Sequence, residues 1–336
     1  MINYKKKEDK IAINKFKNLM IFSIYETNES LKSQNNIKNL MICSIEGLKY
    51  ISIKYTENSI YKFINNWFQQ EITYESCSVF FETKNNIYII GGSHGIYHLN
   101  HLGKIIKHIP GIFKGGIKIN DNLVGFTYNS LKSDEPKLIF YNIESESICK
   151  EIKNYSFIIS TNGLALMPRE EIDSRNKVLL CACKKYNNND KNGILLVELN
   201  LQYEKFYDTG DYEVYFFCPI FIVKNETNFV NDIDNIIDTD YFFVGGFDKN
   251  KRKGIIKLYK IIFNDYSNSE IEYIQDIIFD NQNIDLEKPI TCIIQSKFTG
   301  KIFITSNDGN VYLFSYPNIS FYLDEDNDMN DNMLFL

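Results

Sequence analysis

The sequence has almost no alanine, the residue with the strongest intrinsic preference for helices. In its place isoleucine is abundant, with 23 tyrosines and 25 phenylalanines, which suit the half-buried pleated surface of strands. Hydrophobic residues make up 44% of the chain, so a folded core is expected and intrinsic disorder is excluded. The composition therefore favours an all-β fold.

Long apolar runs are also missing. A transmembrane helix needs about 18 to 20 predominantly apolar residues, and the run from Val214 to Val223 is too short and contains Pro219. Residues 1–17 are charged and lack the apolar centre of a secretory signal. Seven cysteines without regular spacing are typical of reduced, buried thiols. These absences predict a cytoplasmic protein without a transmembrane segment.

The chain lacks an excess of positive charge, since its formal net charge is −6. General nucleic-acid binding depends on a basic surface that contacts phosphates, so we expect none here. One local exception is the stretch from Lys249 to Lys253, which carries four cations within five residues. Such a patch suits an acidic protein, a phosphoinositide headgroup or RNA. The competing interpretation is a solvated turn that keeps a sheet edge soluble.

One unit recurs along the chain: two short apolar strands joined by a polar or glycine-containing turn. The last copy runs from Lys301 to Ser306 and from Asn310 to Ser315, with Asp308-Gly309 in the turn, a strong hairpin signal. Six such hairpins begin near residues 40, 87, 123, 178, 241 and 301. A further apolar run precedes and follows each hairpin, which gives four strands per unit.

Six four-stranded sheets in tandem bury both faces most economically by packing against their neighbours in a β-propeller. We therefore predict a propeller of four-stranded antiparallel blades over residues 18–323. Residues 1–17 and the acidic tail 324–336 are expected to be flexible. Six blades are favoured, with seven as the alternative, because Leu19–Tyr25 belongs either to the first sheet or to the last. Two β-sandwich domains with a boundary near Glu170–Asn176 are the competing hypothesis.

The turn and third strand of two repeats carry a family resemblance. Ser306-Asn-Asp-Gly-Asn-Val-Tyr-Leu-Phe-Ser315 and Gly95-Ile-Tyr-His-Leu-Asn100 resemble the corresponding strand of WD-repeat and citron-homology propellers. The Trp-Asp and Gly-His dipeptides of that family are missing, and the single tryptophan, Trp67, lies elsewhere in its unit. The resemblance is to a divergent WD-repeat-like propeller, which implies a platform for binding partners.

No motif predicts catalysis, a cofactor or a metal ion. The four histidines, His94, His98, His101 and His108, share one segment, but a strand between His94 and His101 separates them by about 20 Å, so we expect surface histidines. Cys181-x-Cys183 lacks a second ligand pair and is interpreted as buried and structural. Glycine-rich stretches precede strands, where phosphate loops precede helices.

We therefore predict a non-enzymatic scaffold that binds another protein. Two alternatives stay open: a membrane-trafficking or tethering component with a citron-homology-like propeller, whose basic loop contacts anionic lipid, and a propeller hydrolase or lyase. The candidate interaction residues are those of the basic turn together with one tyrosine and one arginine in other loops: Lys249, Lys251, Arg252, Lys253, Tyr212 and Arg169. Partner, process and oligomeric state are not specified by the sequence.

Overall fold

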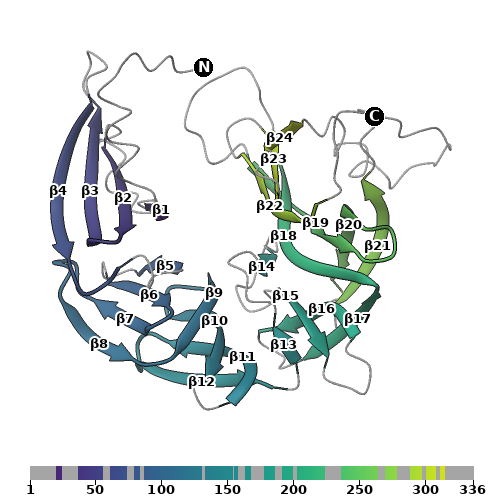
Figure 1. Ribbon diagram of the computed structural model, residues 1–336, viewed down its shortest axis with the longest axis horizontal. Helices are drawn as coiled ribbons and strands as arrows, with labels where there is room; N and C mark the ends of the chain where they lie inside the picture. Colours follow the sequence, from purple (N-terminus) through teal and green to yellow (C-terminus); the bar gives the residue numbers. More distant parts are fainter. Residues whose placement is uncertain are drawn as a thin grey trace. The chain divides into compact units, whose positions relative to one another are not determined.

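The regular elements are all strands in the described part of the chain (Figure 1). The computed structural model describes residues 20–24, 37–55, 61–73, 79–83, 87–130, 133–153, 155–157, 163–167, 178–185, 191–199, 203–223, 236–263, 269–277, 288–296, 300–307 and 311–314. These residues form six antiparallel sheets, here numbered sheet 1 to sheet 6 in chain order. The sheets belong to two compact units, Met1–Glu151 and Ile152–Leu336. No helix among the described residues is long and apolar enough to cross a membrane.

The first unit contains three four-stranded sheets in which each strand pairs with the next along the chain. Sheet 1 consists of β1 (Met20–Ile24), β2 (Ile37–Ser44), β3 (Gly47–Tyr55) and β4 (Tyr61–Gln69). Sheet 2 consists of β5 (Val79–Glu82), β6 (Tyr88–Gly92), β7 (Gly95–Leu99) and β8 (Ile105–Ile109). Sheet 3 consists of β9 (Ile112–Lys118), β10 (Leu123–Ser130), β11 (Ser133–Asn142) and β12 (Ser147–Ile152).

The second unit repeats the pattern. Sheet 4 consists of β13 (Tyr155–Phe157), β14 (Leu164–Met167), β15 (Val178–Lys185), β16 (Lys191–Glu198) and β17 (Glu204–Gly210). Sheet 5 consists of β18 (Tyr212–Val223), β19 (Ile236–Asp248), β20 (Lys253–Ile262) and β21 (Glu270–Ile277). Sheet 6 consists, in its described part, of β22 (Ile290–Gln295), β23 (Ile302–Ser306) and β24 (Val311–Phe314).

Burial along the strands explains why the sequences of the inner strands are continuous apolar runs. Every residue of β6 and β7 is buried, whereas β8, at the edge of sheet 2, alternates between half-buried and exposed positions. Similarly, the first six residues of β15 and the last seven of β16 are buried. Inner strands are therefore covered on both faces, and edge strands on one.

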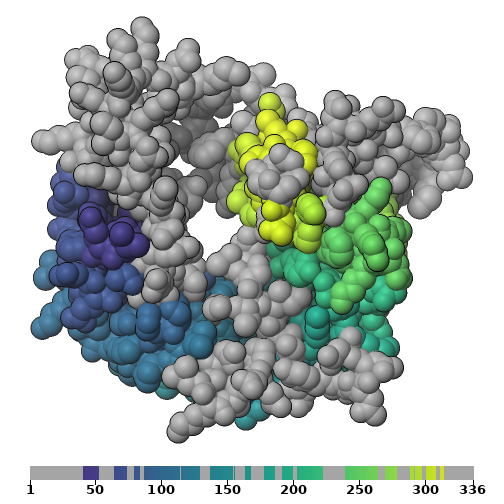
Figure 2. All heavy atoms as spheres, in the orientation of Figure 1, coloured from purple at the N-terminus to yellow at the C-terminus, as the bar shows by residue number. Residues whose placement is uncertain are grey.

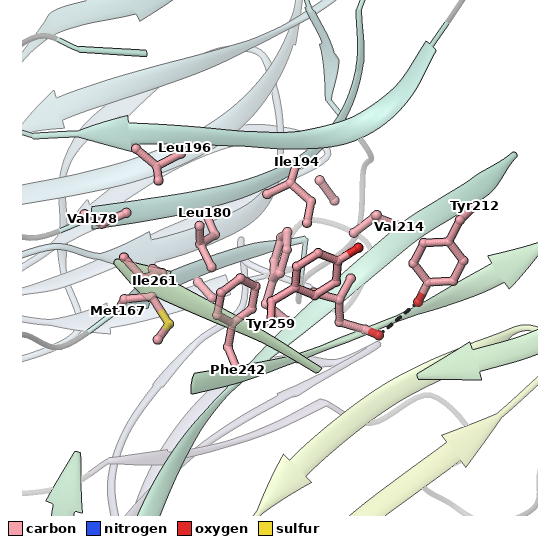
Figure 3. Packing of buried hydrophobic residues seen from close by; sticks show 14 residues of the cluster. Met167, Val178, Leu180, Ile194, Leu196, Tyr212, Val214, Phe242, Tyr259 and Ile261 are labelled. Atoms are coloured by element: carbon pink, nitrogen blue, oxygen red, sulfur yellow. Dashed lines mark hydrogen bonds between the residues drawn. The ribbon is translucent and has the colours of Figure 1, made fainter. Parts of the chain in front are cut away.

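Neighbouring sheets within a unit supply that cover, and in the space-filling view their side chains lie against one another (Figure 2). One apolar cluster joins sheet 1 to sheet 2, and another joins sheet 2 to sheet 3. Likewise, sheet 5 packs on sheet 4 through one cluster, drawn in Figure 3, and on sheet 6 through a second. Because the middle sheet of each unit packs on two neighbours, the hypothesis of two-sheet sandwiches is wrong.

Of the two sheets predicted for Leu19–Tyr25, the first is correct, because Met20–Ile24 pairs with β2 in sheet 1. Two other boundaries differ from the predicted ones. The run Phe157–Met167 splits into β13 and β14, both paired with β15. Phe157 and Leu164 are seven positions apart while their partners, Cys183 and Cys181, are only two apart, so β13 and β14 are separate elements. The polar composition of residues 225–240, which are rich in Asn and Asp, predicts an inserted loop, but β19 already begins at Ile236.

Several predicted features lie outside the described residues. They are the segments 1–17 and 324–336, the expected last strand 319–323 and the turn at 308–310. The same holds for Arg169.

Candidate interaction site

The basic loop, defined as residues 249–253, joins β19 to β20 in a well-ordered turn. The Asp248 carboxylate accepts hydrogen bonds from the backbone N–H groups of Asn250 at 3.0 Å and Lys251 at 2.9 Å. Aspartate at this position stabilises a turn by replacing backbone acceptors. The Lys249 N–H donates to the Asp211 carbonyl at 3.2 Å, which ties the loop to the connection between sheets 4 and 5. The loop therefore presents its cations from a defined backbone.

Two of the loop's cations already have acidic partners. Lys249 Nζ lies 2.8 Å from Glu213 Oε1. Lys251 Nζ lies 3.6 Å from a carboxylate oxygen of Asp276 and 3.9 Å from one of Asp248. These carboxylates offset part of the positive charge that the sequence shows at this loop.

The other two cations face solvent. Arg252 and Lys253 are exposed and form no ion pair with any residue that the structure describes. Arg252 also adopts a left-handed backbone conformation with φ of 52°, so the turn sets the direction in which this residue leaves the chain. Arg252 and Lys253 are the part of the basic loop that is free to contact a partner.

Glu213 connects the basic loop to sheet 4. Its side chain is 14% exposed and accepts hydrogen bonds from Lys249, from Lys184 Nζ at 3.2 Å and from the Tyr215 hydroxyl at 2.7 Å. Burial by itself would raise the pKa of Glu213. The three hydrogen bonds outweigh burial and lower the pKa to about 2, so this carboxylate is ionised at neutral pH.

Tyr212, predicted as an interaction residue, is a core residue, and we correct its assignment. It is 2% exposed and belongs to the cluster between sheets 4 and 5. Its hydroxyl lies 2.9 Å from the Val244 carbonyl oxygen, the dashed contact in Figure 3, and 2.8 Å from that of Ile255. Burial raises the pKa of this hydroxyl well above its usual value. The sequence predicts a loop at Tyr212. In the structure β18 begins at this residue, and the ring is buried.

Replacing Tyr212 with phenylalanine is expected to destabilise the protein by about 1 kcal/mol, because two buried carbonyls lose a donor while the ring still fills its site. Urea unfolding measures the change. Tyr273→Phe is the matched control, since Tyr273 is 50% exposed and its hydroxyl bonds Asp276 at the surface. Equal stability of the two variants would show that the buried hydroxyl contributes nothing.

The four histidines do not converge on one point. His94 is exposed and its carbonyl oxygen lies 2.8 Å from His108 Nε2, while His108 stacks on Tyr97 with ring centroids 4.4 Å apart. His101 is exposed, but His98 is 3% exposed, so the prediction of surface histidines is wrong for His98. Among the described residues, no group of three or more His, Cys, Asp or Glu side chains is arranged to hold a metal ion.

The cysteine pair is buried, as predicted. Cys181 and Cys183 are both inaccessible to solvent and both are free thiols. Burial raises the pKa of each thiol, which keeps both protonated and unreactive.

Sequence reasoning found the basic loop but not its acidic partners. Asp211, Glu213 and Asp276 lie 23 to 42 positions from Lys253, and no local pattern links them to it. Only the antiparallel order of β18, β19, β20 and β21 brings them to one end of sheet 5.

Comparison with known proteins extends the fold assignment. No protein-family model matches the sequence, and no curated protein matches it. Among solved structures, hydrazine synthase from Kuenenia stuttgartiensis matches with a TM-score of 0.50 and 9% identity, over 83% of this chain and 80% of that one. Sqt1 from Chaetomium thermophilum matches with a TM-score of 0.49 and 10% identity, over 82% of this chain and 80% of that one. The β-propeller domain of the Trilobed protease from Pyrococcus furiosus matches with a TM-score of 0.40 and 9% identity, over 83% of this chain and 77% of that one.

The chain has a β-propeller fold. It resembles a divergent WD-repeat-like propeller, as the repeated hairpins indicated. At identities of 9 to 10% these likenesses concern the fold alone, so the activities named for the matched proteins are not transferred. The number of blades, six with seven as the alternative, stays a prediction.

Proposed function

We propose that this propeller is a non-enzymatic scaffold that binds another protein through the basic loop, with Arg252 and Lys253 contacting an acidic surface of the partner. The observation that carries the proposal is the contrast within the loop: its backbone is held by Asp248 and Asp211, while these two cations form no ion pair within the described part of the chain. Because hydrogen bonds already hold the backbone of the turn, binding costs little backbone conformational freedom, and the two cations steer association with an acidic partner.

The mixed charge around the loop favours a protein over a membrane. Lipid surfaces attract clusters of uncompensated cations, whereas here Glu213 and Asp276 lie directly beside Lys249 and Lys251. Alternating charges of both signs suit a complementary protein surface, where like charges also exclude wrong partners.

Affinity capture from extract tests the proposal. The wild-type protein is expected to retain one partner in fixed stoichiometry through gel filtration, and Arg252→Glu/Lys253→Glu is expected to reduce the retained amount at least tenfold. Lys104→Glu/Lys288→Glu is the matched control, since it reverses two exposed lysines elsewhere and changes net charge equally. Retention of the partner by the loop variant at the wild-type level, or absence of any stoichiometric partner, would refute the proposal.

The same variants separate the lipid alternative. Binding to vesicles containing anionic phospholipid is expected to be weak and equal for the wild type, the loop variant and the control. Strong vesicle binding that only the loop variant loses, without a protein partner, would replace the proposal with the lipid-tethering hypothesis.

A further inference from the structure

A second polar cluster, far from the basic loop in sequence, lies between sheets 2 and 3 of the first unit. It consists of His98 on β7, Lys107 on β8, Tyr141 on β11 and Glu146 in the turn between β11 and β12. The His98 ring is 3% exposed and shares the apolar interface that includes Ile96 and Tyr141. Nothing in the function proposed above uses these residues.

The cluster leaves three buried polar atoms without a hydrogen bond in the described part of the chain: both ring nitrogens of His98 and the Tyr141 hydroxyl. His98 Nδ1 lies 3.5 Å from Glu146 Oε1 but lacks hydrogen-bond geometry. Buried polar atoms are nearly always paired, and an unpaired one costs free energy that a rearrangement giving it a partner or water would recover.

Lys107 holds the turn closed. Its ammonium lies 2.7 Å from the Glu146 carbonyl oxygen and 3.0 Å from Glu146 Oε2, so one side chain bonds both the backbone and the carboxylate of this residue. Glu146 itself has a left-handed backbone, with φ of 51°, which is strained for a residue other than glycine. The turn of sheet 3 therefore depends on a contact from sheet 2.

We propose that His98, Lys107 and Glu146 form a proton-operated latch that holds the β11–β12 turn against sheet 2 at neutral pH and releases it on acidification. A neutral imidazole tolerates the buried site, whereas an imidazolium needs water or a full ion pair. The charged groups that act on His98 are Glu146 and Lys107, and Tyr141 joins the cluster through Glu146. Glu146 attracts the imidazolium but is already bonded to Lys107, whose charge repels it, and the Tyr141 hydroxyl is neutral because burial, with Glu146 nearby, raises its pKa to about 12.

The direction of the effect follows from linkage. Burial lowers the pKa of His98 below 6.5, with Glu146 opposing the shift and Lys107 adding to it. Opening the turn returns the ring to water and to its ordinary pKa, so the open state binds the proton more tightly. Above pH about 6.5 the proton does not favour opening, so the closed state keeps its full stability. As the pH falls from 6.5 toward the lower pKa of the closed state, the equilibrium constant for opening rises by up to about tenfold per pH unit.

Hydrogen exchange of the full chain tests the latch. After correction for intrinsic rates, exchange of the amides at 143–147 is expected to rise about tenfold between pH 7 and pH 5 in the wild type. In His98→Gln the rise is expected to disappear, while His101→Gln, at an exposed histidine three positions away, retains it.

Two further measurements keep the test decisive if His98→Gln folds poorly. In the wild-type protein, the NMR titration of the His98 ring is expected to have its midpoint below the ordinary histidine value of about 6.5. Lys107→Met is expected to raise exchange at 143–147 at both pH values and to flatten the pH dependence. A His98 midpoint at or above the ordinary value, or the same exchange profile in wild type and His98→Gln, would overturn the latch.

Discussion

Replacing Gly246 with alanine is expected to destabilise the protein by about 3 kcal/mol, corresponding to a drop in melting temperature of about 4 °C. A Cβ at this position would lie 1.9 Å from the Glu213 carbonyl oxygen, and backbone atoms in a paired strand cannot move aside cheaply. Val214 pairs with Gly246 in the ladder between β18 and β19, so the clash forces these strands apart. Differential scanning calorimetry measures the effect.

Gly125→Ala is the matched control for this substitution. Gly125 also lies in a paired strand, but a Cβ there would meet its nearest neighbours, side-chain atoms of Ile117 and Ile119, at ordinary contact distances of 3.5 and 3.6 Å. It is expected to change the melting temperature by less than a third as much. If Gly246→Ala fails to yield soluble protein while Gly125→Ala folds, the prediction holds; equal melting temperatures would contradict it.

Replacing Glu213 with glutamine is expected to destabilise the protein by about 2 kcal/mol at pH 7, the second-largest effect. Glutamine keeps the shape of the side chain but loses the charge that Lys184 and Lys249 share. Breaking a buried ion pair costs more, but these lysines are 35% and 52% exposed, so water compensates part of the loss. Urea unfolding of the two proteins gives the difference.

The pH dependence of the same variant provides a separate check. The pKa of Glu213 is about 2 in the folded protein against an ordinary value of 4.5, so its contribution is present above pH 4.5 and is lost as the pH falls toward 2. The gap between wild type and Glu213→Gln is therefore expected to shrink between pH 5 and pH 3. Glu272→Gln, an exposed glutamate on β21, serves as control. A gap that stays constant over this range would show that the charge of Glu213 does not stabilise the fold.

Much of the fold follows from sequence because strand signals are local. Alternating or continuous apolar runs bounded by polar turns predicted nearly all described strands within a few residues, since side-chain period and turn chemistry act over short distances. The two failures have different causes. The split of the run Phe157–Met167 into β13 and β14 depends on its pairing with β15, a contact between strands, whereas the polar composition before Tyr241 hid the start of β19.

Only half of the candidate site was predictable, because its charge pairs form between strands that are distant in the sequence. The four cations of the basic loop stand together in the sequence, but their acidic partners reach them through pairing between strands. The burial of Tyr212 and His98 likewise depends on the neighbouring sheet, because alternation along one strand does not show how deeply its face is covered. Charge clusters are therefore visible in a sequence, whereas charge compensation is not.

The most direct test of the account is the affinity of the purified partner for this propeller, measured by titration calorimetry at about 50 and 300 mM salt. We expect Arg252→Glu/Lys253→Glu to bind at least tenfold more weakly than the wild type at the lower salt, and to lose less affinity between the two salt concentrations. Lys104→Glu/Lys288→Glu is expected to bind as the wild type does. Equal affinities of the loop variant and the wild type at both salt concentrations would contradict the assignment of the basic loop as the binding site.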